Sequence, residues 1–242
     1  YMKSKITMYE VTHKKVDFIP NGRTPIFVGN GENLENYLSD NTGDNISIKN
    51  KNYCELTAMY WIWKNDKESD FVSIEHYRRF FMKNGIIVSQ KKILKDLCKS
   101  DIITSKTFKF SKSIFEYYKE HHFSTDIEII RNIILEKYPC YLSAFDNYFE
   151  SNESCMLNMV ACKKNIFDEY CVWLFDILFE LEQKIDISDR DLYQSRVYGF
   201  LSERLLNVWL LEKKYKIKKY NIFYLKKHKI SSWFYSIYKG LK

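Results

Sequence analysis

Glycine and proline are scarce in this chain, which has only 7 glycines and 3 prolines among its 242 residues. The scarcity excludes the Gly-rich loops that cradle phosphates, and neither G-x-G-x-x-G nor G-x-x-x-x-G-K-[ST] occurs. We therefore expect few loops and long helices.

Metal and disulfide motifs are missing as well. The six cysteines form no C-x-x-C pair, and His and Cys do not occur at metal-ligand spacing. Each cysteine lies in an apolar or helical context, which favours buried, reduced thiols and a cytosolic protein. The sequence shows no secretory signal peptide and no apolar run of bilayer-spanning length.

Aromatic residues, in contrast, are abundant. The chain is 17% aromatic, with 19 Tyr and 17 Phe, and 45% hydrophobic, which is ample for a core. Helical patterns alternate with short apolar runs of strand length, and no internal repeat is visible. This alternation predicts an α/β domain with a mostly parallel central sheet.

The stretch Asp70–Phe80 combines a predicted buried strand with a cluster of charge. Its apolar half, Phe71 to Ile74, gives way to Glu75-His76-Tyr77-Arg78-Arg79. In open α/β sheets, ligands bind at the carboxyl edge of the strands. Adjacent arginines at such an edge suit a diphosphate, although solvated arginines following a strand are an equally good interpretation.

Other candidate residues follow predicted elements in the same way. Residues 5–11 predict a first strand closed by Thr12 and His13, and residues 17–52 look irregular. Residues 52–65 predict a helix in which Glu55 and Thr57 interrupt an apolar segment, and Ser188 or Asp189 is expected to begin a last core helix that ends near residue 211.

Residues 213–242 differ in character from the rest. They contain no acidic residue and interleave lysine with Tyr, Phe, Trp and Ile. We expect a basic amphipathic helical tail attached to a domain spanning residues 1–212. Such a tail favours an anionic membrane surface, and it could equally bind nucleic acid.

Several stretches together resemble a bacterial family of capsular polysaccharide synthesis proteins, glycosyltransferases formerly classed as a domain of unknown function. The stretches run in order across residues 5–211: Thr12-His13-Lys14, Asp40 to Ser47, Asn52 to Ala58, His76 to Arg79, Asn158-Met159 and Gly199 to Leu205. The resemblance implies a single GT-A-like, Rossmann-like domain that uses a nucleotide-sugar donor. The usual Asp-x-Asp metal motif is absent, so a divalent metal (Mn²⁺ or Mg²⁺) stays possible without a motif to support it.

The resemblance and the residue chemistry together suggest a division of roles. Catalytic candidates, as the general base of an inverting transfer, are Glu203 first, then Asp189 and Asp191, then Glu55. The residues expected to bind the donor are Thr12, His13, Asp44, Asn45, His76, Arg78 and Arg79. The residues expected to contact the rest of the substrate are Glu55, Thr57, His122 and Asn158.

The hypothesis is therefore a hexosyltransferase acting in surface-polysaccharide biosynthesis, with galactose in pyranose or furanose form as the first guess. Its partners would be a nucleotide-sugar donor (a UDP-sugar), a lipid-linked or glycan acceptor and the inner face of the cell membrane, to which a cytoplasmic protein would bind peripherally. The alternatives are a nucleic-acid-binding protein and a non-catalytic sugar-nucleotide binder, although the body carries no nucleic-acid motif.

Overall fold

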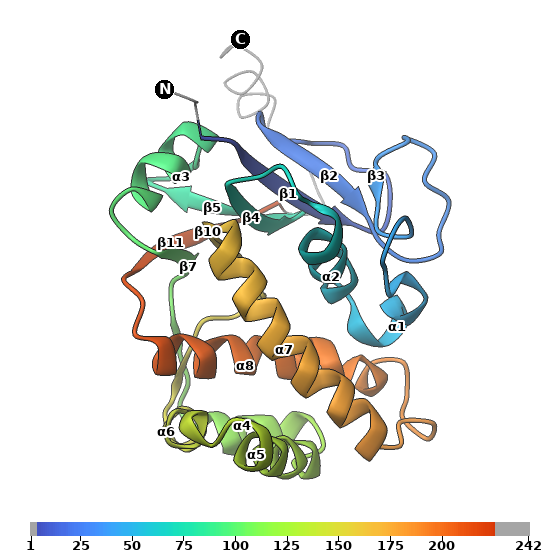
Figure 1. Cartoon of the computed structure of the whole chain (residues 1–242), viewed down its shortest axis with the longest axis vertical. Coiled ribbons are helices and arrows are strands. Elements are labelled where there is room, and N and C mark those ends of the chain that lie inside the picture. The colour runs from blue at the N-terminus through green and yellow to red at the C-terminus, as the bar shows by residue number, and fades with distance from the viewer. Residues whose placement is uncertain (1–3, 226–242) are drawn as a thin grey trace.

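The computed structural model describes residues 4–225, which form a large sheet with helices packed against it (Figure 1). The described part contains a nine-stranded sheet and a separate two-stranded one. In spatial order, the large sheet consists of β3 (Leu38–Ser39), β2 (Arg23–Phe27), β1 (Ile6–Thr12), β4 (Phe71–His76), β10 (Val160–Lys163), β7 (Ile102–Ser105), β11 (Ile217–Tyr224), β5 (Arg79–Lys83) and β6 (Ile86–Ile87). The small sheet pairs β8 (Phe108–Lys109) with β9 (Glu153–Ser154).

The expected parallel, Rossmann-like sheet is wrong. Only the β3-β2-β1-β4 side and the β7–β11 pair are parallel, whereas β4–β10, β10–β7, β11–β5 and β4–β5 are antiparallel. Because β4 also pairs with β5, the strands β4, β10, β7, β11 and β5 close into a ring. The physical reason is local: only Tyr77 and Arg78 separate β4 from β5, and a connection this short permits only antiparallel pairing.

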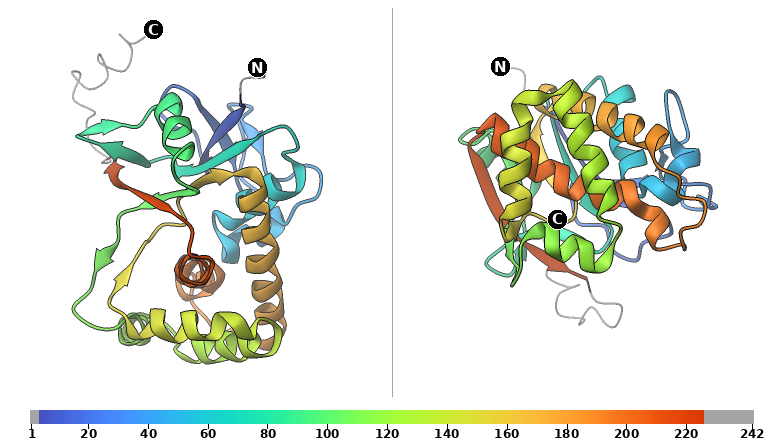
Figure 2. Two further views of the ribbon diagram at one scale, coloured as in Figure 1. Left: turned by 60° about the vertical axis from the view of Figure 1, so that its left-hand side comes forward. Right: turned by 90° about the horizontal axis from the view of Figure 1, so that it is seen from below.

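Helix α3 (Gln90–Leu97) packs against one face of the sheet, where Ile93 and Leu97 form one apolar cluster with Met8 and Ala161. The other helices cover the opposite face and build a layer below it. They are α1 (Asn50–Tyr53), α2 (Leu56–Asn65), α4 (Ile114–His121), α5 (Thr125–Lys137), α6 (Leu142–Glu150), α7 (Lys164–Lys184) and α8 (Val197–Lys213), with short 3₁₀ turns η1 (Ser47–Lys49), η2 (Pro139–Tyr141) and η3 (Gln194–Arg196). Figure 2 shows α8 end-on between the sheet and the layer of α5 and α6. The largest apolar core fills the space among these helices and the sheet.

Strand β11 replaces part of the expected helical tail. Residues 217–224 pair in parallel with β7 and antiparallel with β5, and Tyr220 is buried against Phe81. The exposed lysines 218 and 219 are compatible with a strand because they remain in solvent while Tyr220 enters the core. The remaining tail residues, 226–242, lie outside the described residues. Within residues 4–225, no helix is long and apolar enough to cross a membrane.

Other expectations hold only in part. The segment expected to be irregular contains β2, β3 and α1, and the last core helix begins at Val197 rather than near residue 188. The helix expected from residue 52 is interrupted at Cys54. All six cysteines are free thiols, but Cys98 and Cys140 are exposed rather than buried.

The parallel pairing of β1 with β4 places two carboxyl groups side by side inside the protein. Glu10 and Glu75 are cross-strand partners, and both are fully buried. Arg23 of β2 donates to Glu75 Oε2 over 2.7 Å, whereas neither oxygen of Glu10 has a hydrogen-bond partner. Burial, with the neighbouring Glu75 charge as a second cause, raises the pKa of Glu10 to about 8. Glu10 is therefore protonated at neutral pH.

This protonation makes folding stability depend on pH. The folded pKa of Glu10 lies above the unfolded value, so its contribution is complete below about pH 4.5 and is lost as pH rises through about 8. We expect wild type to lose at least about 1.4 kcal/mol more unfolding free energy than Glu10→Gln between pH 6 and pH 9. Urea unfolding at each pH measures the difference. The exposed Glu32→Gln serves as the control, and parallel curves for Glu10→Gln and wild type would contradict the assignment.

Candidate active site

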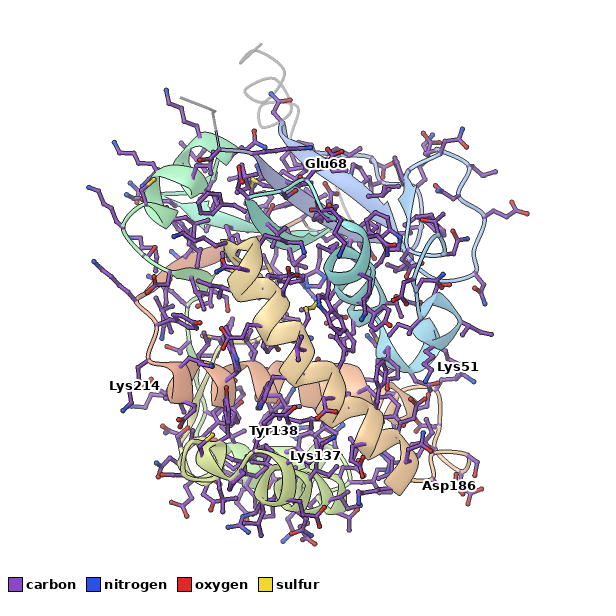
Figure 3. The ribbon with its side chains drawn as sticks, viewed as in Figure 1. Lys51, Glu68, Lys137, Tyr138, Asp186 and Lys214 are labelled. Carbon is purple, nitrogen blue, oxygen red and sulfur yellow. The ribbon has the colours of Figure 1, made fainter. Side chains whose placement is uncertain are left out.

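A cavity of about 620 Å³ opens at the carboxyl ends of β1 and β4. Four elements build its wall: the end of β1, the β4–β5 hairpin, α1 and the start of α2, with contributions from η3 and the end of β11. The lining residues are Val11, Thr12, His13, Val28, Asn50, Lys51, Cys54, Glu55, His76, Tyr77, Arg78, Arg79, Arg196, Tyr224 and Leu225. Figure 3 shows Lys51 on α1, on the side of the molecule opposite Lys214 at the end of α8.

The arginines of this chain divide into two groups. Of seven in the sequence, four pair with carboxylates: Arg23 with Glu75, Arg131 with Asp146, Arg190 with Asp126 and Arg204 with Glu203. The other three, Arg78, Arg79 and Arg196, line the cavity and form no ion pair with any carboxylate in the described part of the chain. Several arginines that form no ion pair at one cavity are typical of a site that binds an anion with several charges, such as a diphosphate.

The positive charge at the cavity comes from arginine and lysine rather than histidine. Burial lowers the pKa of His76 below its ordinary value, despite the nearby Glu55 carboxylate. Burial, followed by the charges of Lys14, Arg78 and Arg196, lowers the pKa of His13. Both imidazoles are therefore neutral at pH 7. His76 Nε2 lies 2.6 Å from the Leu157 carbonyl oxygen, which can only accept, so Nε2 carries the hydrogen.

The turn at Leu157 and Asn158 joins the cavity wall to α8. Both residues have positive φ, 84° and 49°, a conformation that is strained for a leucine. The turn is held from three sides: His76 donates to the Leu157 carbonyl, the Leu157 N–H donates to Glu203 Oε1 over 3.1 Å, and Asn158 Nδ2 donates to Glu55 Oε1 over 2.7 Å. Asn158 Nδ2 also lies 2.8 Å from Ser202 Oγ. We call this segment the 157–158 turn.

Glu55 and Glu203 meet at this turn but occupy different environments. Glu55 is partly exposed and lines the cavity, with one oxygen fixed by Asn158. Glu203 does not line the cavity; its oxygens accept from the Leu157 N–H and from Arg204 Nη1 over 2.9 Å. Burial raises the pKa of Glu203, and Arg204 opposes that rise. Glu55 is thus the carboxylate that a bound molecule can reach.

Cys54 fixes the direction in which Glu55 points. Its backbone has φ 53° and ψ −131°, and this sharp change of direction ends α1 and places Glu55 directly before α2. Asn50 Nδ2 donates to the Cys54 carbonyl over 2.7 Å, and Arg196 Nε donates to Cys54 Sγ over 3.1 Å. Burial raises the pKa of the Cys54 thiol, so it stays protonated.

The structure brings six of the expected site residues together as cavity-lining groups, Thr12, His13, Glu55, His76, Arg78 and Arg79, with Asn158 and Glu203 directly behind them. Thr57 lies behind the wall, where its hydroxyl accepts from Asn50 Nδ2 over 3.0 Å. The roles assigned to these residues stay predictions.

The remaining expected residues do not line the cavity. Asp44 and Asn45 belong to the turn before η1, where Asp44 accepts from Tyr60 and Asn45 bonds within its own turn. Asp189 and Asp191 lie on the exposed loop before η3, and Asp191 Oδ1 accepts the N–H groups of Tyr193 and Gln194. His122 lies against Phe200, with a centroid separation of 4.4 Å.

Sequence reasoning missed Arg196 and Lys51 as cavity residues. The sequence shows Arg196 as a charged residue on a largely apolar predicted helix. That Arg196 lines the cavity and forms no ion pair with a carboxylate in the described residues follows only from its neighbours in the fold. Tyr224 and Leu225 had no signal, because their segment reads as a tail; in the structure, the Leu225 N–H donates to the Arg78 carbonyl over 2.8 Å.

The side chains at this cavity do not fit a divalent cation. Arginine, lysine and histidine dominate the wall, and Glu55 is its one carboxylate within residues 4–225. No group of three His, Cys, Asp or Glu side chains in the described residues is arranged to hold a metal ion.

The chain is similar to known proteins in both sequence and fold. The sequence profile of the family described as "Domain of unknown function (DUF4422)" matches residues 7–215. Among solved structures, the apo form of WbbM, a bifunctional glycosyltransferase, is similar with a TM-score of 0.83 and 26% sequence identity. The match covers 93% of this chain and 46% of the WbbM chain, so this chain spans less than half of that protein. Comparison with curated proteins gives no significant match.

The unpaired arginines lead to a binding prediction. Inorganic pyrophosphate at about a hundred times its Kd should add about 2.7 kcal/mol of stability and raise Tm by about 5 °C or more. Arg79→Ala should leave the Tm of the free protein nearly unchanged, because Arg79 is exposed and has no ion pair to lose, but should remove most of the pyrophosphate shift. Differential scanning fluorimetry measures both.

The control is Arg131→Ala, which removes an arginine that pairs with Asp146 away from the cavity. That variant should retain the full pyrophosphate shift. Equal losses in the two variants would show that the shift reflects overall charge rather than the cavity.

Proposed function

The chain belongs to the DUF4422 family, and from this membership and the geometry of the cavity we propose that it is a glycosyltransferase using a nucleotide-sugar donor. The observation that carries the proposal is the meeting of three unpaired arginines with one accessible carboxylate, Glu55, in a single cavity. The similarity to WbbM, a glycosyltransferase, supports the same reaction class.

The arginines supply the electrostatic part of the reaction. Arg78, Arg79 and Arg196 bind the diphosphate of the donor and stabilise the negative charge that grows on it as the sugar departs. Arginine suits this role because its fork of N–H donors matches phosphate oxygens and because it stays charged at every working pH. The neutral His76 contributes no charge; its hydrogen bond to the Leu157 carbonyl holds the 157–158 turn against the cavity wall.

Glu55 supplies the base. Its carboxylate takes the proton from an acceptor hydroxyl while the hydroxyl oxygen attacks the anomeric carbon, and the bond from that carbon to the diphosphate oxygen breaks. The nucleoside diphosphate leaves with the bonding electrons, and the configuration at the anomeric carbon inverts. We assign the base to Glu55 rather than Glu203 because Glu55 lines the cavity and its carboxylate is oriented by the Asn158 amide. The Glu203 oxygens already accept hydrogen bonds from the Leu157 N–H and from Arg204. Asp189 and Asp191 lie outside the cavity wall.

The expected identity of the substrates extends this proposal. The donor to test first is a UDP-linked hexose, with galactose in pyranose or furanose form leading the series. The proposed setting is capsular or other surface polysaccharide, with a lipid-linked acceptor at the inner face of the cell membrane. The sequence supports the membrane contact in one respect: residues 226–242 include five lysines and one tryptophan, a composition that favours an anionic membrane surface.

Replacing the proposed base tests the reaction. A thermal-shift screen of sugar nucleotides, with and without Mg²⁺ or Mn²⁺, identifies the donor. With that donor, Glu55→Gln should lose about a hundredfold or more in transfer rate, the usual effect of removing a general base, and should keep its donor-induced Tm shift. The exposed Glu136→Gln on α5 is the matched control and should transfer at the wild-type rate.

Two results would count against the proposal at different levels. Transfer by Glu55→Gln within threefold of wild type would remove Glu55 as the base. Donor binding without release of nucleoside diphosphate in any acceptor mixture would make the protein a non-catalytic binder.

The tail leads to a separate prediction. Each lysine near an anionic surface contributes about 1 kcal/mol of membrane attraction. Charge reversal of Lys226, Lys227 and Lys229 to glutamate should therefore abolish flotation with phosphatidylglycerol vesicles. Reversal of three exposed lysines around α3 (Lys91, Lys95 and Lys99) changes net charge equally and should leave flotation intact. Equal losses in both variants would mean that net charge, not the tail, governs binding.

A further inference from the structure

A partly exposed cluster of aromatic rings lies beside the cavity, next to Arg196. It consists of His122 at the end of α4, Tyr193 before η3 and Phe200 in α8, and we call it the aromatic shelf. The Phe200 centroid lies 4.4 Å from that of His122 and 4.9 Å from that of Tyr193, and the His122 and Tyr193 rings are nearly parallel at 20°. Tyr193 is 53% exposed, which is the largest exposed fraction among the Phe, Tyr and Trp side chains of residues 4–225.

Hydrogen bonds hold the shelf in place without using its faces. Asp191 Oδ1 accepts the N–H groups of Tyr193 and Gln194 over 2.8 and 2.7 Å. Gln194 Nε2 donates to the His121 carbonyl over 2.7 Å, and Gln194 Oε1 lies 3.1 Å from His122 Nδ1. Since the amide oxygen can only accept, His122 Nδ1 carries the hydrogen and Nε2 is left as an acceptor. Burial lowers the pKa of His122, so the ring is neutral.

The shelf is continuous with the cavity. Arg196 lines the cavity, and its Cζ lies 5.7 Å from the Phe200 ring centroid. The turn between Tyr193 and Arg196 is tied to α1, because Asn52 Nδ2 donates to the Ser195 carbonyl over 2.9 Å. A molecule whose reacting end reaches Glu55 can therefore extend across Arg196 onto the shelf.

We propose that the aromatic shelf is the acceptor subsite, where a neutral sugar ring of the glycan acceptor stacks on Tyr193 and Phe200; this rests on the proposed function. A sugar ring has an apolar face that packs against aromatic rings and hydroxyl groups at its edge that need polar partners. Here those partners are His122 Nε2 and the Tyr193 hydroxyl, which makes no hydrogen bond with any residue in the range 4–225. The diphosphate, in contrast, belongs among the arginines.

The test uses a panel of methyl glycosides of galactose, glucose, mannose, rhamnose and N-acetylglucosamine with the full chain, read by saturation-transfer NMR. We expect at least one glycoside to bind wild type, and Tyr193→Ala to weaken that binding about five- to tenfold. Tyr193→Phe, which keeps the ring, should retain most of it. The control is Phe123→Ala, which removes an exposed ring that stacks on Arg190 instead of the shelf.

A second arm separates acceptor from donor. Tyr193→Ala should keep the pyrophosphate-induced Tm shift and, once the donor is known, should raise the acceptor KM with little change in the donor KM. Loss of the pyrophosphate shift in Tyr193→Ala would assign the shelf to the donor, and binding of no glycoside by wild type would refute the subsite. If the protein binds a glycoside but transfers no sugar, the acceptor subsite is supported and the proposed function is refuted. If Tyr193→Ala leaves sugar transfer unchanged, the proposed function is supported and the acceptor subsite is refuted.

Discussion

The hydrogen bonds around the 157–158 turn are the constraint on which the site depends. The amide of Asn158 joins Glu55 at the start of α2 to Ser202 in α8, and the backbone of Leu157 joins His76 at the end of β4 to Glu203 in α8. Three elements far apart in sequence are thus fixed to one another by a few polar atoms in a largely buried place. Because unpaired polar groups are costly there, the arrangement is rigid and specific. The strained backbone of the turn is tolerated only because these bonds determine it.

The arginines at the cavity lack the carboxylate partners that the other arginines of the described residues have. Elsewhere, arginines are neutralised, even deep in the sheet, where Arg23 satisfies Glu75 and holds the strand that leads into the β4–β5 hairpin. Glu75 also accepts the Phe81 N–H over 2.7 Å, so one carboxylate fixes both strands of the hairpin. The hairpin then presents Arg78 and Arg79 without counter-charges. Arg78, Arg79 and Arg196 therefore repel one another at the cavity, an arrangement that is typical of a site that binds an anionic ligand.

Sequence reasoning succeeded where a local pattern carried the information. The first strand and the strand beginning at Phe71 were visible from their apolar, β-prone residues. The sheet order was not visible, because alternating helices and short strands are compatible with both parallel and antiparallel pairing. Strand β11 was missed because its lysines and tyrosines resemble a surface-binding segment, and only its neighbours β7 and β5 make it a strand.

The sequence by itself determined which residue types are available for chemistry: His76, Arg78 and Arg79 after a buried strand, the carboxylates Glu55 and Glu203, and the amide of Asn158. It also determined family membership, since the matching pattern spans residues 7–215. Only the tertiary structure decided which carboxylate faces the cavity, that Arg196 completes a set of unpaired arginines, and that the tail contributes a strand. The reason is that exposure and charge pairing belong to the neighbours of a side chain in space, and these neighbours come from segments more than a hundred residues apart.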